Sequence, residues 1–99
     1  MNTVKVYHTK EKSFDPAEEF APSLFELVAE VTVQGEDEET DLEDAWGKTN
    51  TVRNYWWENP GVLALRKETR STSIGDVLEY KGKFYAVQRM GFRSIPEVQ

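Results

Sequence analysis

The stretch "VLEYKGKFYAVQRM", residues 77–90, decides the expected fold. Two runs rich in Val, Leu, Tyr and Phe flank the short polar segment Lys81–Lys83, which has Gly82 at its centre. Residues of these types favour strands, and a glycine between two such runs is typical of a tight hairpin turn. Residues 77–90 therefore predict an antiparallel β-hairpin, which makes a β-sheet the framework of the domain.

Further strands are expected on both sides of this hairpin. "TVKVYH", residues 3–8, alternates valine with Lys and Tyr. "LFELVAEVTV", residues 24–33, has a period of two that places Phe25, Leu27, Ala29 and Val31 on one side. A helix competes there, because Leu, Glu and Ala are good helix formers. Two shorter strands are expected near residues 62–68 and 92–95.

The acidic segment "QGEDEETDLED", residues 34–44, holds seven carboxylates and no base. Thr40 and Glu43 have the spacing of a capping box, which predicts a helix that begins at residue 41. Leu42, Ala45, Trp46 and Thr49 then recur at the i, i+3, i+4 and i+7 positions of one helix face, which is expected to pack on the sheet. Residues 34–41 are expected to form an acidic loop.

Together these elements predict one α+β domain over residues 1–99. It would be a small, mostly antiparallel, curved sheet of four to six strands packed against one helix near residues 41–50. A partly open barrel of the SH3-like or PUA-like kind is the alternative.

The residues of catalytic chemistry are scarce in this chain. There is no cysteine, which excludes disulfides, thiolate zinc sites and cysteine nucleophiles. The one histidine, His8, is expected at the surface near the end of a strand, and no motif supplies it with metal-binding or catalytic partners. The acidic segment does not match an EF-hand loop, because Gly35 precedes the carboxylates. We therefore expect no enzymatic activity, no metal site and no cofactor.

Charge is distributed unevenly along the chain. The net charge is −6, but residues 1–47 hold 13 acidic and three basic side chains, whereas residues 48–99 hold five and nine. This unevenness is typical either of solvated faces with one acidic loop or of an acidic face that docks on a basic partner. If it is a docking face, the contact residues are expected to be Glu36, Asp37, Glu38, Glu39, Asp41, Glu43 and Asp44.

Two further groups of residues are candidate contact sites. In "KTNTVRNYWWENPGV", residues 48–62, the cluster Tyr55, Trp56 and Trp57 has the composition of a binding hot spot. Alternation along an extended chain predicts that one tryptophan packs in the core and the other lies near the surface, and burial of both is the alternative. Arg70, Ser71 and Ser73 could bind an anion, or the serines could bond nearby backbone in a turn.

The C-terminal third is similar to the "S-x-S-x-x-D-V…G…Y…GF" stretch of the YodL-like domain family. The matching residues are Ser71, Ser73, Asp76, Val77, Gly82, Tyr85, Gly91 and Phe92. The segments "FELVAEV", "TNTVRNYWWEN" and "TRSTSIGDVLEYKGKFYAVQRMGFRSI" also resemble small uncharacterised proteins of prokaryotic phages, plasmids and genomes. The resemblance implies a mobile-element setting and assigns no activity and no functional residues.

These observations predict a small, acidic, cytoplasmic binding protein, encoded by a phage or plasmid, that docks on a host protein and modulates or inhibits it. The host protein would carry a basic surface, as a nuclease or CRISPR effector subunit does, and the acidic segment could imitate DNA. The alternative is a nucleic-acid-binding module that uses the basic, aromatic C-terminal half, although a net-acidic chain disfavours direct nucleic-acid binding. No membrane span or secretory signal is expected. The oligomeric state stays open.

Overall fold

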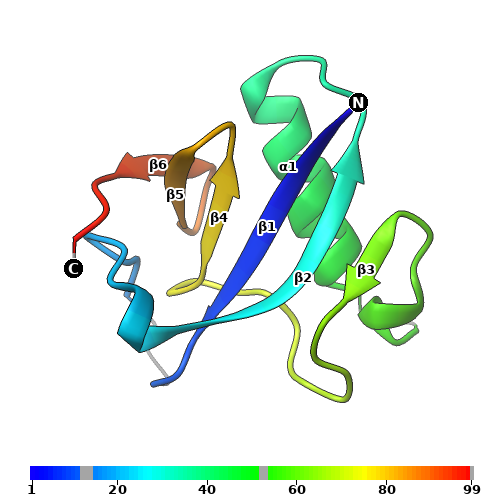
Figure 1. Ribbon diagram of the computed structural model, residues 1–99, viewed down its shortest axis with the longest axis horizontal. Coiled ribbons are helices and arrows are strands. Elements are labelled where there is room, and N and C mark those ends of the chain that lie inside the picture. Colours follow the sequence, from blue (N-terminus) through cyan, green and yellow to red (C-terminus); the bar gives the residue numbers. More distant parts are fainter. Residues whose placement is uncertain (12–14, 52–53, 99) are drawn as a thin grey trace.

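The computed structural model describes residues 1–11, 15–51 and 54–98 (Figure 1). The chain forms, in order, β1 (Asn2–Thr9), the 3-10 turn η1 (Pro22–Leu24), β2 (Phe25–Val33), α1 (Glu38–Thr49), the 3-10 turn η2 (Trp56–Glu58), β3 (Val62–Ala64), β4 (Val77–Tyr80), β5 (Lys83–Val87) and β6 (Phe92–Ile95).

The six strands form one antiparallel sheet in the order β3-β2-β1-β4-β5-β6. The sheet is open, with β3 and β6 at its edges, and α1 crosses one of its faces (Figure 1). This is the first of the two predicted architectures, an α+β fold built on an antiparallel sheet with one helix. β1 lies in the middle because it pairs with β2 on one side and with β4 on the other.

The predicted hairpin of residues 77–90 is confirmed. β4 pairs with β5 from Val77 opposite Ala86 to Tyr80 opposite Lys83, so Lys81 and Gly82 alone form the turn. Both have positive φ, 52° at Lys81 and 79° at Gly82, as a type I′ turn requires. Gly82 adopts this conformation without steric cost, and its presence here fixes the register of the two strands.

A β-bulge in β2 corrects the predicted alternation of residues 24–33. Val6 pairs with Ala29 and Tyr7 with Leu27, so Val28 is the extra residue. As a result Ala29 and Val31 lie in the core under α1, whereas Phe25 packs in the cluster on the other face. A bulge bends the strand and increases its twist, which gives the sheet its curvature.

The main core lies between α1 and the sheet. It contains Val4 and Val6 from β1, Leu42 and Ala45 from α1, and Trp56 from η2, all of them at most 2% exposed. Full burial of a valine or leucine side chain contributes about 1.5–3 kcal/mol, so these contacts hold α1 to the sheet. On the opposite face a smaller cluster forms around Phe20, which stacks on Phe84 with ring centroids 4.3 Å apart.

Within the described residues, no helix has both the length and the apolar character that crossing a membrane requires.

Candidate binding surfaces

The N-terminal end of α1 carries the acidic residues. The helix begins three residues earlier than predicted, at Glu38, and its N-cap is Asp37 rather than Thr40. The Asp37 side chain accepts a hydrogen bond from the Thr40 backbone N–H at 2.7 Å, and this interaction lowers the pKa of Asp37. The predicted acidic loop of residues 34–41 is therefore shorter, because Glu38 to Asp41 already belong to the first helical turn.

Two of the seven predicted contact carboxylates are not free. Asp41 is 1% exposed, because it shares the sheet-facing side of α1 with Leu42 and accepts a hydrogen bond from the Tyr80 hydroxyl. Burial contradicts its predicted place on a docking face. Asp44 is half-buried and forms an ion pair with Lys48 at 3.0 Å.

The five remaining carboxylates are exposed: Glu36, Asp37, Glu38, Glu39 and Glu43. Within the part of the chain that the structure describes, none of these five forms an ion pair. Glu38 also has a structural contact, since it accepts a hydrogen bond from the Tyr85 hydroxyl. Burial and this hydrogen bond raise the pKa of Tyr85 to about 12.

An apolar groove of about 340 Å³ lies along the C-terminal half of α1 and begins at Glu43. It lies between α1 and the β5–β6 connection, and Glu43, Trp46, Val87 and Phe92 contribute to its walls. Trp46 is 37% exposed, which corrects the prediction that it belongs to the buried face of the helix. Leu42, Ala45 and Thr49 are buried as predicted. We call the five exposed carboxylates together with this groove the α1 surface.

Glu39, Glu43 and Trp46 stand at the i, i+4 and i+7 positions of α1, so they share one helix face. Sequence reasoning missed this role of Trp46 because it placed the aromatic contact elsewhere in the chain. The i, i+4 and i+7 spacing of Glu39, Glu43 and Trp46 was the sequence signal that could have identified this role.

Tyr55, Trp56 and Trp57 lie beyond the C-terminal end of α1, around η2. Trp56 is buried, and its indole N–H donates to the carbonyl oxygens of Thr69 at 3.0 Å and Arg70 at 3.1 Å. Trp57 is half-buried and Tyr55 is 62% exposed, and their rings stack 4.8 Å apart. The prediction of one buried and one surface tryptophan is confirmed, but both residues lie in a 3-10 turn and not in an extended chain. Burial contradicts the use of Trp56 as a contact residue.

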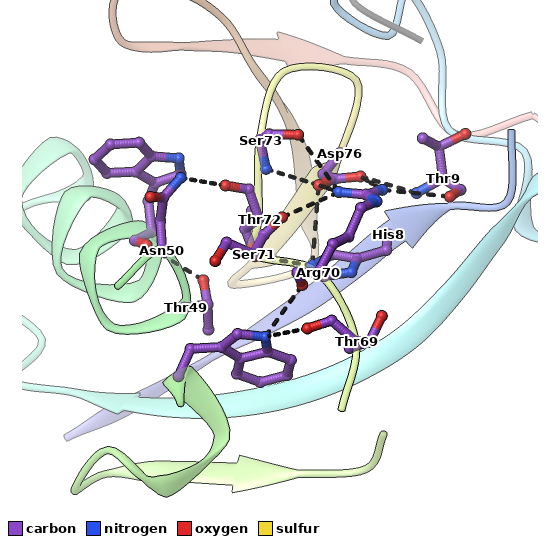
Figure 2. A network of polar contacts seen from close by, with 12 residues as sticks. His8, Thr9, Thr49, Asn50, Thr69, Arg70, Ser71, Thr72, Ser73 and Asp76 are labelled. Carbon is purple, nitrogen blue, oxygen red and sulfur yellow. Dashed lines mark hydrogen bonds and ion pairs between the residues drawn. The ribbon is translucent and has the colours of Figure 1, made fainter. Parts of the chain in front are cut away.

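Arg70 and Ser73 converge on an internal carboxylate (Figure 2). Asp76, fully buried, accepts two hydrogen bonds of 2.6 Å from the Arg70 guanidinium, one of 2.8 Å from the Ser73 N–H and one of 2.9 Å from the Thr9 N–H. The Arg70 guanidinium also donates to the Ser71 carbonyl at 3.1 Å. The hydrogen bonds from Arg70 to Asp76 raise the pKa of Arg70. The cluster predicted from Arg70, Ser71 and Ser73 thus forms around an anion of the chain itself, and binding of an external anion stays a prediction.

His8 belongs to the same network, which corrects its predicted surface position. It is 4% exposed, and its Nε2 lies 2.9 Å from the Thr72 hydroxyl and 3.9 Å from Asp76 (Figure 2). Burial, reinforced by Arg70, lowers the pKa of His8 to about 4 although Asp76 opposes the shift. Thr72 and Asp76 both face Nε2, whereas a catalytic triad places the acid on the other ring nitrogen. We call His8, Thr9, Arg70, Thr72, Ser73 and Asp76 the Asp76 network.

The predicted nucleic-acid surface depends on free cations near the aromatic residues. Arg66 is paired with Glu26 at 3.0 Å and Arg70 with Asp76, whereas Lys67 is exposed and Arg53 lies outside the described residues. Residues 1–11, 15–51 and 54–98 contain no group of three His, Asp or Glu side chains placed to hold a metal ion.

Comparison with protein-family models, with curated proteins and with solved structures finds no match for this chain. The similarity of the C-terminal third to the YodL-like domain family therefore stays a prediction.

Proposed function

We propose that this protein is a small acidic binding module that docks through its α1 surface on a basic partner protein and modulates or inhibits it. The observation that supports this best is the continuity of one helix face. The exposed carboxylates of Glu39 and Glu43 lead directly to Trp46 and to the open apolar groove.

The acidic residues alone are not evidence for a docking surface, because carboxylates in a first helical turn stabilise any helix through its dipole. That effect accounts for Glu38 and Glu39, but it gives no reason for an exposed tryptophan beside a groove two turns later. Protein interfaces combine a tryptophan or other aromatic anchor near the centre with charged residues at the rim. The α1 surface has this arrangement.

The charges indicate the chemistry of the partner. The five exposed carboxylates attract a surface rich in Lys and Arg, and the pairs they form at a rim raise the association rate more than the affinity. The groove, at about 340 Å³, has room for one or two apolar side chains of the partner. The partner is therefore a protein with a basic surface that surrounds an apolar protrusion.

The resemblance to mobile-element proteins supports a phage or plasmid setting, with a partner in the host cytoplasm. In its sharpest version the protein is an inhibitor of host defence, such as an anti-CRISPR or anti-restriction protein. The partner would then be a nuclease or effector subunit whose basic surface binds nucleic acid, and the carboxylates would take the place of phosphates. This gives the α1 surface a DNA-mimic character.

Affinity capture from a prokaryotic host lysate tests the proposal with two variants of equal charge. The triple variant E36Q/E39Q/E43Q neutralises the α1 surface and spares the N-cap Asp37 and the Tyr85 contact Glu38. The control E11Q/E18Q/E19Q changes three exposed carboxylates that line a different hollow, one without any α1 residue, and shifts the net charge equally.

A partner of the α1 surface is retained by the wild type and by the control, and it is lost from E36Q/E39Q/E43Q and from W46A. Retention by all four proteins, or equal loss from both triple variants, contradicts the proposal. Displacement of the partner by double-stranded DNA supports the DNA-mimic version, and retention in excess DNA contradicts that version alone.

A further inference from the structure

A second hollowed surface lies beyond the C-terminal end of α1. It consists of two neighbouring hollows of about 540 and 680 Å³, which share Tyr55, Trp57, Thr69 and Arg70. The first hollow adds neutral polar residues such as Asn54, whereas the second adds the carboxylates Glu58 and Glu68. The five residues Tyr55, Trp57, Glu58, Glu68 and Thr69 are called the aromatic surface below.

The aromatic rings of this surface have a rigid support. Tyr55 stacks on Trp57 with an interplanar angle of 13°, and Trp57 meets Trp56 edge to face with centroids 5.7 Å apart. Trp56 is in turn held by its hydrogen bonds to Thr69 and Arg70. Since one face of Tyr55 is covered by Trp57 and the residue is still 62% exposed, its other face is open to a ligand.

The charges at the second hollow are unbalanced. Glu58 and Glu68 are exposed, and among the described residues neither forms an ion pair. Arg70 is the one basic residue in the walls, and its guanidinium is turned toward Asp76, with both terminal nitrogens bonded there (Figure 2). Glu68 has a φ of 57°, a conformation that glutamate rarely adopts and that persists only where the surrounding structure imposes it.

We infer that the aromatic surface binds the guanidinium group of an arginine side chain presented by a partner polypeptide. A planar guanidinium stacks on an aromatic face and donates hydrogen bonds in a fork that matches carboxylates. Tyr55 supplies the face, and Glu58 and Glu68 supply acceptors from two different segments of the chain. Lysine would fit less well, because its compact ammonium is strongly hydrated and lacks the planar fork.

This site is separate from the α1 surface. The groove of the α1 surface is lined by α1 and the β5–β6 connection, and it shares no lining residue with the two hollows around η2, which follows the C-terminal end of α1 (Figure 1). The site shares with the proposed function only the requirement for a basic partner. A negative binding result at one surface therefore does not contradict the proposal for the other.

A peptide titration followed by ¹H–¹⁵N NMR tests the inference without knowledge of the partner. The probes are acetyl-Gly-Arg-Gly-amide, its lysine analogue and its citrulline analogue, which has nearly the same shape as arginine and no charge. The arginine peptide is expected to bind with a Kd of millimolar order and to shift the indole N–H signal of Trp57 and the amides of residues 55–58 and 68–69. The citrulline peptide is expected to bind about tenfold more weakly.

Two variants of exposed residues locate the effect. Y55A and E58Q/E68Q are each expected to weaken arginine-peptide binding about three- to tenfold, whereas E36Q/E39Q/E43Q leaves it unchanged. Unchanged amide spectra elsewhere show that each variant is folded. The inference is overturned if the arginine and citrulline peptides bind equally, if the shifts map to residues 36–46, or if no binding is detected at about 50 mM peptide.

Discussion

The two ends of α1 use the same kinds of side chain in opposite ways. Toward the N-terminal end, five carboxylates face solvent without ion pairs among the described residues, and Trp46, two turns further along the helix, is 37% exposed. Beside the C-terminal end, Asp76 and Trp56 are buried and every polar atom of their side chains is hydrogen-bonded. Thr49 and Asn50 connect the C-terminal end of α1 to the Asp76 network (Figure 2). The Thr49 carbonyl accepts a hydrogen bond from the Thr72 N–H, and the Asn50 side chain donates one to the Thr72 carbonyl.

This difference separates a structural role from a contact role. A buried charge must be paired, so the hydrogen bonds of Asp76 are explained by packing within the chain and do not indicate a partner. Unpaired charges at the surface cost little in the free protein, and they are available for binding. Substitutions in the Asp76 network should therefore reduce stability, whereas substitutions of Glu36, Glu39 and Glu43 in the α1 surface should reduce binding alone.

The largest expected effect is that of D76N. The substitution keeps the shape of the side chain, but it leaves the half-buried Arg70 guanidinium without its carboxylate and cannot accept all four hydrogen bonds. Because breaking a buried pair leaves an uncompensated charge, we expect a loss of about 3–5 kcal/mol in the free energy of unfolding, reduced by the part of Arg70 that is exposed to water. Urea denaturation measures it. A loss below about 1 kcal/mol would show that the network is not structural.

The second effect is a pH dependence that comes from His8. Its pKa is about 4 in the folded protein and about 6.5 when unfolded, so the unfolded chain binds more protons between these values. Stability is therefore fully present above pH 6.5, is lost as the pH falls toward 4, and changes by up to about 3 kcal/mol over that range. Asp76, Arg70 and Glu26 are the charged groups that act on His8.

Urea denaturation at several pH values, compared between the wild type and H8Q, checks this pH dependence. The difference in stability between the two proteins should fall as the pH is lowered from 6.5 to 4, because only the wild type must protonate a buried imidazole. A difference that stays constant with pH contradicts the assignment to His8.

The next effect is local and lies at the N-cap of α1. D37A removes the acceptor for the Thr40 N–H, and a lost N-cap of this kind costs about 1 kcal/mol. T40A serves as the matched control, since in the structure it is a helical residue and not the cap. Thermal unfolding distinguishes the two: D37A should lower the Tm and T40A should change it much less. The reverse order would place the helix start where the sequence alone suggested.

The smallest expected effect on stability is that of E36Q/E39Q/E43Q. These exposed side chains form no ion pairs in the described structure, so the free energy of unfolding should change by less than about 0.5 kcal/mol. Urea denaturation of this variant beside D76N compares the two ends of α1 directly. A large loss in the free energy of unfolding of the triple variant would mean that these acidic residues stabilise the fold.

Local signals made most of the fold predictable. Gly82 between two strand-forming runs indicated the hairpin, and the alternation of residues 3–8 indicated β1. The start of α1 was missed because Asp37 and Thr40 are both good N-caps, and the choice between them depends on contacts that the local sequence does not contain. The bulge at Val28 was missed for the same reason, since it exists only in the pairing with β1.

The candidate sites were less predictable, because exposure depends on contacts between distant residues. His8 is buried by Thr72, 64 positions away in the chain, and Asp41 is buried against Tyr80, 39 positions away. The exposure of Trp46 follows from packing that leaves its helix face uncovered beside β5 and β6. Residue type and spacing identified the acidic helix, but they could not select which of its carboxylates and aromatics reach solvent.

The most direct test of the α1 surface is the salt dependence of the Kd of the captured partner. It is measured for the wild type, E36Q/E39Q/E43Q and the equally charged control E11Q/E18Q/E19Q. If the α1 surface docks the partner, the first variant should bind about tenfold more weakly near 0.1 M salt and show a shallower salt slope, while the control follows the wild type. Identical slopes and affinities for the two variants would contradict the account, because net charge alone would then determine binding.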